Sequence, residues 1–169
     1  MEIIPIFAPH LTAFRFGKTD EFHQLFANWN DAEYLFEFFK RHEKDLQSDY
    51  YGSITVAEAV RRTRRYALQF ENCIEKLSSN LDNVFTPLRE LEGSHLPRSK
   101  ARENWLRIYA IKVEANIYVV TGGGIKLTRT MNESPHLKVE LNKLQRGRAF
   151  LKEHGISDID GLAELIIPQ

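Results

Sequence analysis

Residues 104–128 decide the fold, and they read NWLRIYAIKVEANIYVVTGGGIKLT. Two β-type runs, Trp105–Val113 and Ile117–Thr121, flank the short polar connection Glu114–Asn116. The connection has a length that suits a hairpin between strands of this kind. The stretch therefore predicts two paired antiparallel strands, closed by a turn at the three glycines 122–124.

Strand alternation gives the run Trp105–Val113 two different faces. One face is apolar, whereas the other places an arginine between two aromatic residues. Such a combination can bind phosphate and stack on nucleic-acid bases. The alternative is a second buried face, in which Arg107 forms a salt bridge with Glu103 or with an acid elsewhere in the chain. The apolar face is Leu106, Ile108 and Ala110, and the other face is Trp105, Arg107, Tyr109 and Ile111.

The glycines 122–124 followed by Lys126 resemble part of a phosphate-binding loop, because glycines let backbone N–H groups approach a phosphate. The nucleotide-binding loop requires G-x-x-x-x-G-K-[ST], however, and Leu127 follows the lysine here. We therefore favour a flexible turn between strands over an NTPase site. A turn beside Lys126 and Arg129 could still contact an RNA backbone.

Two long helical patterns precede the hairpin. Asn30 and Glu33 fit a capping box that opens a helix continuing to Leu46. Thr55 caps a second helix that extends to about Leu77. Arginines at positions 61, 62, 64 and 65 fall on its outer faces, where they form either a solvated surface or a nucleic-acid contact.

The beginning of the chain predicts a β-hairpin or two adjacent strands, Ile3–Phe7 and Leu11–Phe16. Pro5 then favours an edge position, because proline cannot donate a ladder hydrogen bond. Thr19 can cap a short helix that follows these strands.

The last major helix is predicted from its two ends. Ser134 fits the N-cap with Pro135 at the first helical position, and Gly155 ends the helix. Strands at both ends with helices between them predict an α+β fold, with a small antiparallel sheet and a C-terminal helix. The 169 residues suit a single domain, with a mostly helical part over 1–80 and an α+β part over 81–169.

The net charge is zero, but it is unevenly distributed. Arg89–Arg148 carries twelve Lys or Arg residues against six acids, and the remainder carries eleven against seventeen. This asymmetry is typical of a surface that faces phosphate. The alternative is chance clustering on solvated faces. The cations close to the hairpin are Arg98, Lys100, Arg102, Lys112, Lys126 and Arg129.

Other reaction classes have little support. The chain lacks the G-x-S-x-G motif of serine hydrolases, and its six histidines show no metal-binding i, i+4 pair. Cys73 is the single cysteine, which excludes an internal disulfide, and its helical spacing predicts a buried side chain. We therefore expect neither a metal nor another cofactor. The start of the chain resembles neither a signal peptide nor a membrane span, so we expect a cytoplasmic protein that does not interact with membranes.

Asn104–Val113, a short turn, Ile117–Thr128 and a following basic helix resemble the central part of the RelE/HigB-like toxin superfamily. These are small bacterial proteins of toxin–antitoxin modules. Members combine a basic segment, an arginine that begins the central hairpin, a basic loop after its second strand, and a helix that resembles Pro135–His154. The resemblance covers about Phe85–His154, which is less than half of the chain.

The resemblance implies the toxin of a type II module, a ribosome-associated mRNA endoribonuclease that needs no metal. Its implied partners are a cognate antitoxin protein, mRNA and the ribosome. Basic side chains would stabilise the charge that develops on the scissile phosphate while the RNA 2′-OH attacks it. Arg107 would be the leading phosphate ligand, with Lys126 and Arg129 as supporting cations. The implied RNA-binding residues are Trp105, Tyr109, Lys100, Arg102 and Lys112.

The chain also departs from the superfamily. Members usually finish with a strand that carries a catalytic histidine, tyrosine or lysine, whereas Ser157–Gln169 offers none. The segment from Met1 to about Asn80 is longer than the usual helical start. These departures keep a second hypothesis open, a non-catalytic adaptor or regulatory subunit. It would use aromatic helices between Phe22 and Phe39 as a protein interface, with Phe36 outside the inward stripe.

Overall fold

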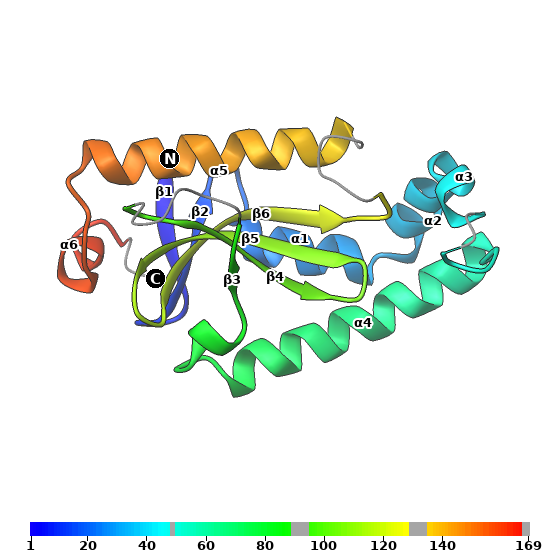
Figure 1. The fold of residues 1–169 in the computed structure, drawn as a ribbon, viewed down its shortest axis with the longest axis horizontal. Coiled ribbons are helices and arrows are strands. Elements are labelled where there is room, and N and C mark those ends of the chain that lie inside the picture. Colours follow the sequence, from blue (N-terminus) through cyan, green and yellow to red (C-terminus); the bar gives the residue numbers. More distant parts are fainter. Residues whose placement is uncertain (48–49, 89–94, 129–134, 167–169) are drawn as a thin grey trace.

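In a computed structural model of the chain, residues 1–47, 50–88, 95–128 and 135–166 are described. Their strands form one six-stranded sheet, whose members lie side by side between layers of helices (Figure 1). The strands are β1 (Glu2–Phe7), β2 (Leu11–Arg15), β3 (Thr86–Pro87), β4 (Arg98–Glu103), β5 (Leu106–Glu114) and β6 (Ile117–Ile125). Their order in the sheet is β1–β2–β6–β5–β4–β3.

Helices cover both sides of the sheet, and the two longest, α4 and α5, flank it on opposite sides (Figure 1). No helix within the described ranges combines the length and apolar character needed to cross a membrane. The helices are α1 (Glu21–Asn30), α2 (Ala32–Arg41), α3 (Glu43–Leu46), α4 (Val56–Lys76), the 3₁₀ turn η1 (Leu81–Asn83), α5 (Pro135–Glu153) and α6 (Ile159–Ala163).

The predicted α+β fold and the predicted central hairpin are confirmed. Strands β5 and β6 pair antiparallel, and Glu114 pairs directly with Ile117. The connection is therefore the two residues Ala115 and Asn116 rather than three, and Asn116 has a φ of 61°, which asparagine tolerates well. The N-terminal strands also form the predicted antiparallel pair, with β1 at the sheet edge as Pro5 requires.

The sheet is larger than the small antiparallel one predicted from the C-terminal half. Strand β2 pairs in parallel with β6, with Leu11 opposite Tyr118 and Ala13 opposite Val120. This pairing joins the first strands of the chain to the central hairpin and makes the sheet mixed. Sequence patterns within one segment carry no information about such long-range pairing, so the join was not predicted.

The prediction of a turn at the three glycines is wrong, because Gly122, Gly123 and Gly124 all belong to β6. They are needed for close packing rather than for turning. A Cβ added to Gly123 would overlap the carbonyl oxygen of Arg107 and lie 2.9 Å from Cδ1 of Leu25. At Gly122 an added Cβ would lie 2.5 Å from Oε2 of Glu140. The glycines therefore let β5, α1 and α5 approach this strand closely.

Two hydrophobic clusters, one on each face, hold the sheet between its helices. The first includes Phe26 and Trp29 of α1 and Phe70 of α4, packed with the apolar β5 face that contains Leu106. The second includes Leu144 of α5 packed against the opposite face of β5. The alternation predicted for β5 is confirmed for this strand. Burial of both faces explains why β5 and β6 are almost continuously apolar.

Several helix boundaries differ from the prediction. The side chains that cap α1 and α2 are those of Asp20 and Asp31, not Thr19 and Asn30. The helix predicted to continue from Asn30 to Leu46 is interrupted at His42, which separates α2 from α3. At the start of α4 the predicted cap is confirmed, since the Glu58 backbone N–H donates to Oγ1 of Thr55. The predicted cap of α5, Ser134, lies outside the described residues.

Cys73 was predicted to be buried, but it is exposed. Phe70 and Ile74, which are one helical turn apart, face the core instead. A residue directly before Ile74 lies about 100° away around the helix. The burial of Cys73 was predicted from its helical spacing with Phe70 and Leu77. In the structure Cys73 instead lies on a neighbouring face of α4, beside the buried one.

The cap of α1 can be tested by two neighbouring substitutions. Asp20 accepts a hydrogen bond from the His23 backbone N–H at 2.9 Å, so Asp20 and not Thr19 is the N-cap of α1. We expect Asp20→Ala to lower the free energy of unfolding by about 1 kcal/mol, because an orphan helix donor loses its acceptor. Thr19→Ala should change it by less than about 0.5 kcal/mol. If urea denaturation showed that both variants lose the same free energy of unfolding, Asp20 would not be the cap of α1.

Candidate functional site

A cavity of about 1020 Å³ opens at the end of the sheet where the β4–β5 turn, the end of β6, α3 and α4 meet. Its walls are rich in cations and in aromatic rings. Concave sites with converging polar groups are the usual places for ligand binding, and this one has about the volume of the larger small-molecule pockets. The lining cations are Lys44, Arg62, Arg102, Arg107 and Lys126, and the lining aromatic residues are Tyr50, Tyr51, Tyr66 and Trp105.

The β4–β5 turn brings two of these cations together. Glu103 pairs with Leu106, so Asn104 and Trp105 form the turn, and Asn104 takes a φ of 56°. This register places Arg102 directly opposite Arg107 on the neighbouring strand. Like charges in this position destabilise a sheet unless an anion lies between them. The pairing thus brings two positive charges to this end of the hairpin.

Arg107 is half-buried and has no carboxylate partner in the part of the chain that the structure describes. One guanidinium nitrogen, Nη1, donates to the carbonyl oxygens of Asn104 at 2.6 Å and Leu106 at 2.9 Å. Nε is buried without a hydrogen-bond partner. Burial lowers the pKa of the guanidinium below its usual value, and nearby Arg102 also lowers it. Arginine stays protonated in proteins, so Arg107 remains a cation, and its Nε has no hydrogen-bond partner among the described residues.

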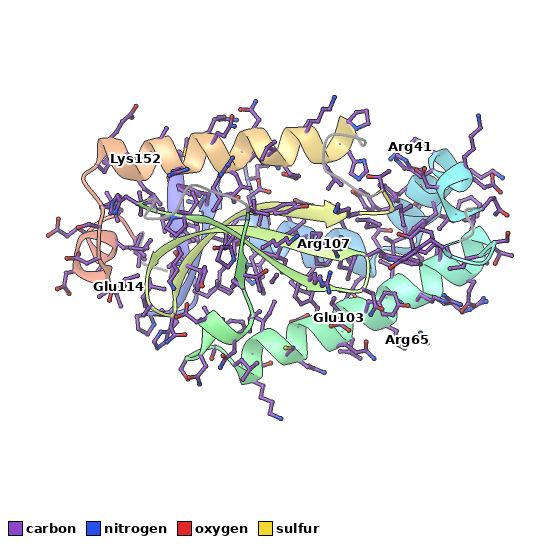
Figure 2. The ribbon with its side chains drawn as sticks, viewed as in Figure 1. Arg41, Arg65, Glu103, Arg107, Glu114 and Lys152 are labelled. Carbon is purple, nitrogen blue, oxygen red and sulfur yellow. The ribbon has the colours of Figure 1, made fainter. Side chains whose placement is uncertain are left out.

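A salt bridge between Arg107 and Glu103, which the alternative interpretation of this strand allowed, is absent from the described contacts of both residues. Figure 2 labels both side chains on the part of the sheet near the β4–β5 turn, with Glu114 at the opposite end of the hairpin. Glu103 instead accepts a hydrogen bond from the amide of Asn104. The alternative of an acid-paired, buried Arg107 is therefore not what the structure shows.

Lys126 reaches the same cavity because β6 ends beside the β4–β5 turn. Its backbone N–H donates to the Trp105 carbonyl oxygen at 2.7 Å, which continues the pairing of the two strands past Ile125. Lys126 and Arg107 both line the cavity, so the structure brings together two of the three predicted phosphate ligands. The third, Arg129, lies outside the described residues.

Trp105 forms part of the aromatic wall, but it does not lie on the Arg107 face of the strand as predicted. It precedes β5, so it does not follow the strand alternation. The indole is only 5% exposed, packs in the cluster that contains Leu106, and donates from Nε1 to Oγ1 of Thr63 at 2.9 Å. The rings of Tyr51 and Tyr66 contact it edge-on. Trp105 is thus placed as a support for the wall.

The remaining predicted RNA-binding residues divide into two groups. Arg102 is exposed at the cavity, and Lys100 lies two residues before it on β4, opposite Tyr109. Burial lowers the pKa of Lys100 below its usual value, and Arg107 and Arg102 lower it further. Tyr109 does share the Arg107 face, but it is 1% exposed, and burial raises its pKa to about 12. Lys112 forms an ion pair with Asp82 at 3.2 Å and does not line the cavity.

Six lining residues come from the first 80 positions and were not predicted as site residues. Tyr51 is held in the wall by its hydroxyl, which donates to the Leu127 carbonyl oxygen at 3.2 Å. Arg62 is paired with Glu58 at 3.0 Å. The one available sequence signal was the group of arginines in α4, for which a nucleic-acid contact had been considered. The six residues are Lys44, Asp45, Tyr50, Tyr51, Arg62 and Tyr66.

Comparison of the chain with protein-family models, with curated proteins and with solved structures gave no match. Within the described ranges, no three His, Cys, Asp or Glu side chains gather as metal ligands would. The expectation that the protein works without a metal stays a prediction.

Proposed function

We propose that the cavity binds single-stranded RNA, and that the protein is the toxin of a type II toxin–antitoxin module that cleaves mRNA on the ribosome without a metal. Cleavage would begin with attack of a 2′-OH on the adjacent phosphate. The observation that carries the proposal is Arg107, a half-buried cation opposite Arg102, without a carboxylate partner among the described residues. A partly desolvated cation of this kind is costly unless an anion binds it.

The combination of charges and rings favours RNA over a small anion. Cations line several walls of the cavity, which suits consecutive phosphates better than a single one. Tyr50 is 88% exposed and contacts Tyr51 edge-on, so its ring offers a free face for an unstacked base. Stacking on such rings contributes about 1 to 3 kcal/mol per base. Proteins usually recognise single-stranded RNA through this combination.

The proposed reaction needs electrostatic stabilisation and proton transfer. The P–O2′ bond forms as the P–O5′ bond breaks, which leaves a 2′,3′-cyclic phosphate and a 5′-hydroxyl end. Arg107 and Lys126 would stabilise the additional negative charge on the phosphate oxygens. In this reaction the 2′-OH loses a proton and the leaving 5′ oxygen gains one. Burial and the charge of Arg107 lower the pKa of Lys100, but Lys100 does not line the cavity, so we assign it no role in this transfer.

An adaptor function has one observation in its favour. Phe36 is 53% exposed and Tyr34 is 38% exposed, so α2 does present aromatic side chains to solvent as predicted. Such a surface could bind another protein, and it suits the cognate antitoxin as well as another partner. The adaptor hypothesis does not account for Arg107, however. A protein that binds its partner through α2 does not need a cationic cavity.

The salt dependence of RNA binding tests the proposal. We expect a short single-stranded RNA to bind at low salt, with a slope of about −0.7 per contacted phosphate in a plot of log affinity against log salt. Arg102→Ala should weaken binding and remove roughly one contact from the slope. Arg64→Ala is the matched control, because Arg64 is exposed on α4 and does not line the cavity. Undetectable binding, or equal effects of both variants, would exclude this interface.

A further inference from the structure

The cavity contains one side chain that does not suit a phosphate site. Among the described residues that line it, Asp45 is the one carboxylate, and five cations line the same cavity. A carboxylate repels phosphate, so its presence weakens binding of the RNA backbone. Asp45 must therefore face a different part of the ligand if it contributes to binding at all.

Asp45 is not neutralised by the lining cations. Its one ion pair among the described residues is with Nδ1 of His42, at 3.6 Å on the preceding helical turn. Burial lowers the pKa of His42 below its usual value, and His136 lowers it further, so the imidazole is mostly neutral at pH 7. A carboxylate has several acceptor sites, so Asp45 can accept hydrogen bonds from a ligand beside its contact with His42.

The aromatic wall places a base within the environment of this carboxylate. Asp45 and Tyr51 both line the cavity, and the charge of Asp45 contributes to raising the pKa of Tyr51, although burial contributes most. Tyr50 packs edge-on against Tyr51 with ring centroids 4.8 Å apart. A base stacked on either tyrosine would lie in the cavity that Asp45 also lines.

Guanine is the base whose edge matches a carboxylate best. Its N1–H and N2 amino group are neighbouring donors, so each can donate to one carboxylate oxygen. Adenine and cytosine each offer one amino group beside a ring nitrogen that accepts. Uracil offers one N–H between two carbonyl groups. A carboxylate disfavours each of these neighbouring acceptors.

We infer that Asp45 is a specificity-determining residue that reads the N1–H and N2 amino edge of a guanine stacked on the tyrosine wall, so that the preferred substrate is RNA with a guanine at this position. This inference rests on the proposed function, because it places the guanine beside a phosphate held by the cations. Asp45 acts here in base recognition and not in the proton transfer of the reaction.

Binding of nucleoside monophosphates tests the inference. We expect the wild-type protein to bind guanosine monophosphate at least about 10-fold more tightly than inosine monophosphate, which lacks the N2 amino group, and adenosine monophosphate. Asp45→Asn should reduce the preference to less than about 2-fold. It should leave the affinity for adenosine monophosphate equal or higher, because a negative charge is removed from an anion site. Glu43→Gln is the matched control, since Glu43 lies on the same short helix outside the cavity.

Each outcome decides the inference. A wild-type protein that binds all three nucleotides equally or none of them, or a preference that survives Asp45→Asn, overturns it. So does loss of RNA cleavage in Asp45→Asn with an unchanged guanine preference, which would assign Asp45 to the reaction instead. If RNA binds in an Arg107-dependent way without any preference for guanine, the inference fails and the proposed function stands. If Arg107→Ala leaves RNA binding unchanged, the proposed function itself fails.

Discussion

Arg107→Ala should abolish growth arrest and lower the rate of mRNA cleavage by about 10² to 10³. The reason is that Arg107 lines the cavity at the point where β4 and β5 bring two cations together. The same substitution removes a cation that burial disfavours, so the free energy of unfolding should change by no more than about 1 kcal/mol. The measurement is cleavage of a translated message by purified variants, beside thermal denaturation of each.

Two controls separate activity from folding. Lys112→Ala removes a cation of the same strand that is paired with Asp82 and lies outside the cavity, and it should leave cleavage nearly unchanged. Leu106→Ala removes a fully buried side chain and should cost about 2 to 5 kcal/mol of stability. Its activity should fall only with the amount of folded protein. Toxicity that survives Arg107→Ala would remove Arg107 from the reaction.

Gly123→Ala should destabilise the protein by at least about 3 kcal/mol, because the new Cβ meets the backbone of β5 rather than a flexible side chain. The overlap involves the carbonyl of Arg107, so the hairpin and the cavity should be disturbed together. Gly17→Ala provides the matched control, since no atom lies within 4 Å of its Cβ. It should change stability by less than about 1 kcal/mol. Equal urea midpoints for both variants would contradict the observed packing of β6.

The parts of the fold that were predictable depend on short sequence distances. The β5–β6 hairpin, the start of α4 at Thr55 and the end of α5 near Gly155, which has a φ of 66°, follow from local patterns. Such patterns fix a cap only to within a residue when two suitable side chains are adjacent, as Thr19 and Asp20 show. The choice between them depends on backbone geometry that the sequence does not specify.

The glycines of β6 show how tertiary packing can override a local rule. Three consecutive glycines usually indicate a turn, because glycine readily adopts backbone conformations with positive φ that other residues rarely adopt. Here the deciding contacts come from Arg107, Leu25 and Glu140, which are distant in the sequence. Each of them approaches a position where a Cβ would collide. A single sequence does not reveal these approaches, so the strand was assigned too short.

The candidate site was only half predictable for a related reason. Arg107 and Lys126 could be proposed from the hairpin, since strand alternation and proximity along the chain relate them. Tyr51 and Arg62 meet them only because α3 and α4 pack against the end of the sheet. Trp105 was misplaced because alternation was extended into a turn. Contacts between segments far apart in the sequence therefore supply the second half of the cavity.

Inducible expression in bacteria, followed by mapping of new RNA ends, tests the proposed toxin function most directly. We expect growth to stop and translated messages to acquire new 5′-hydroxyl ends after induction of the wild-type protein. Expression of the antitoxin from a neighbouring gene should prevent both effects. Normal growth with no new ends, in cells that contain well-folded protein at the same level, would contradict the endoribonuclease and leave the adaptor hypothesis in its place.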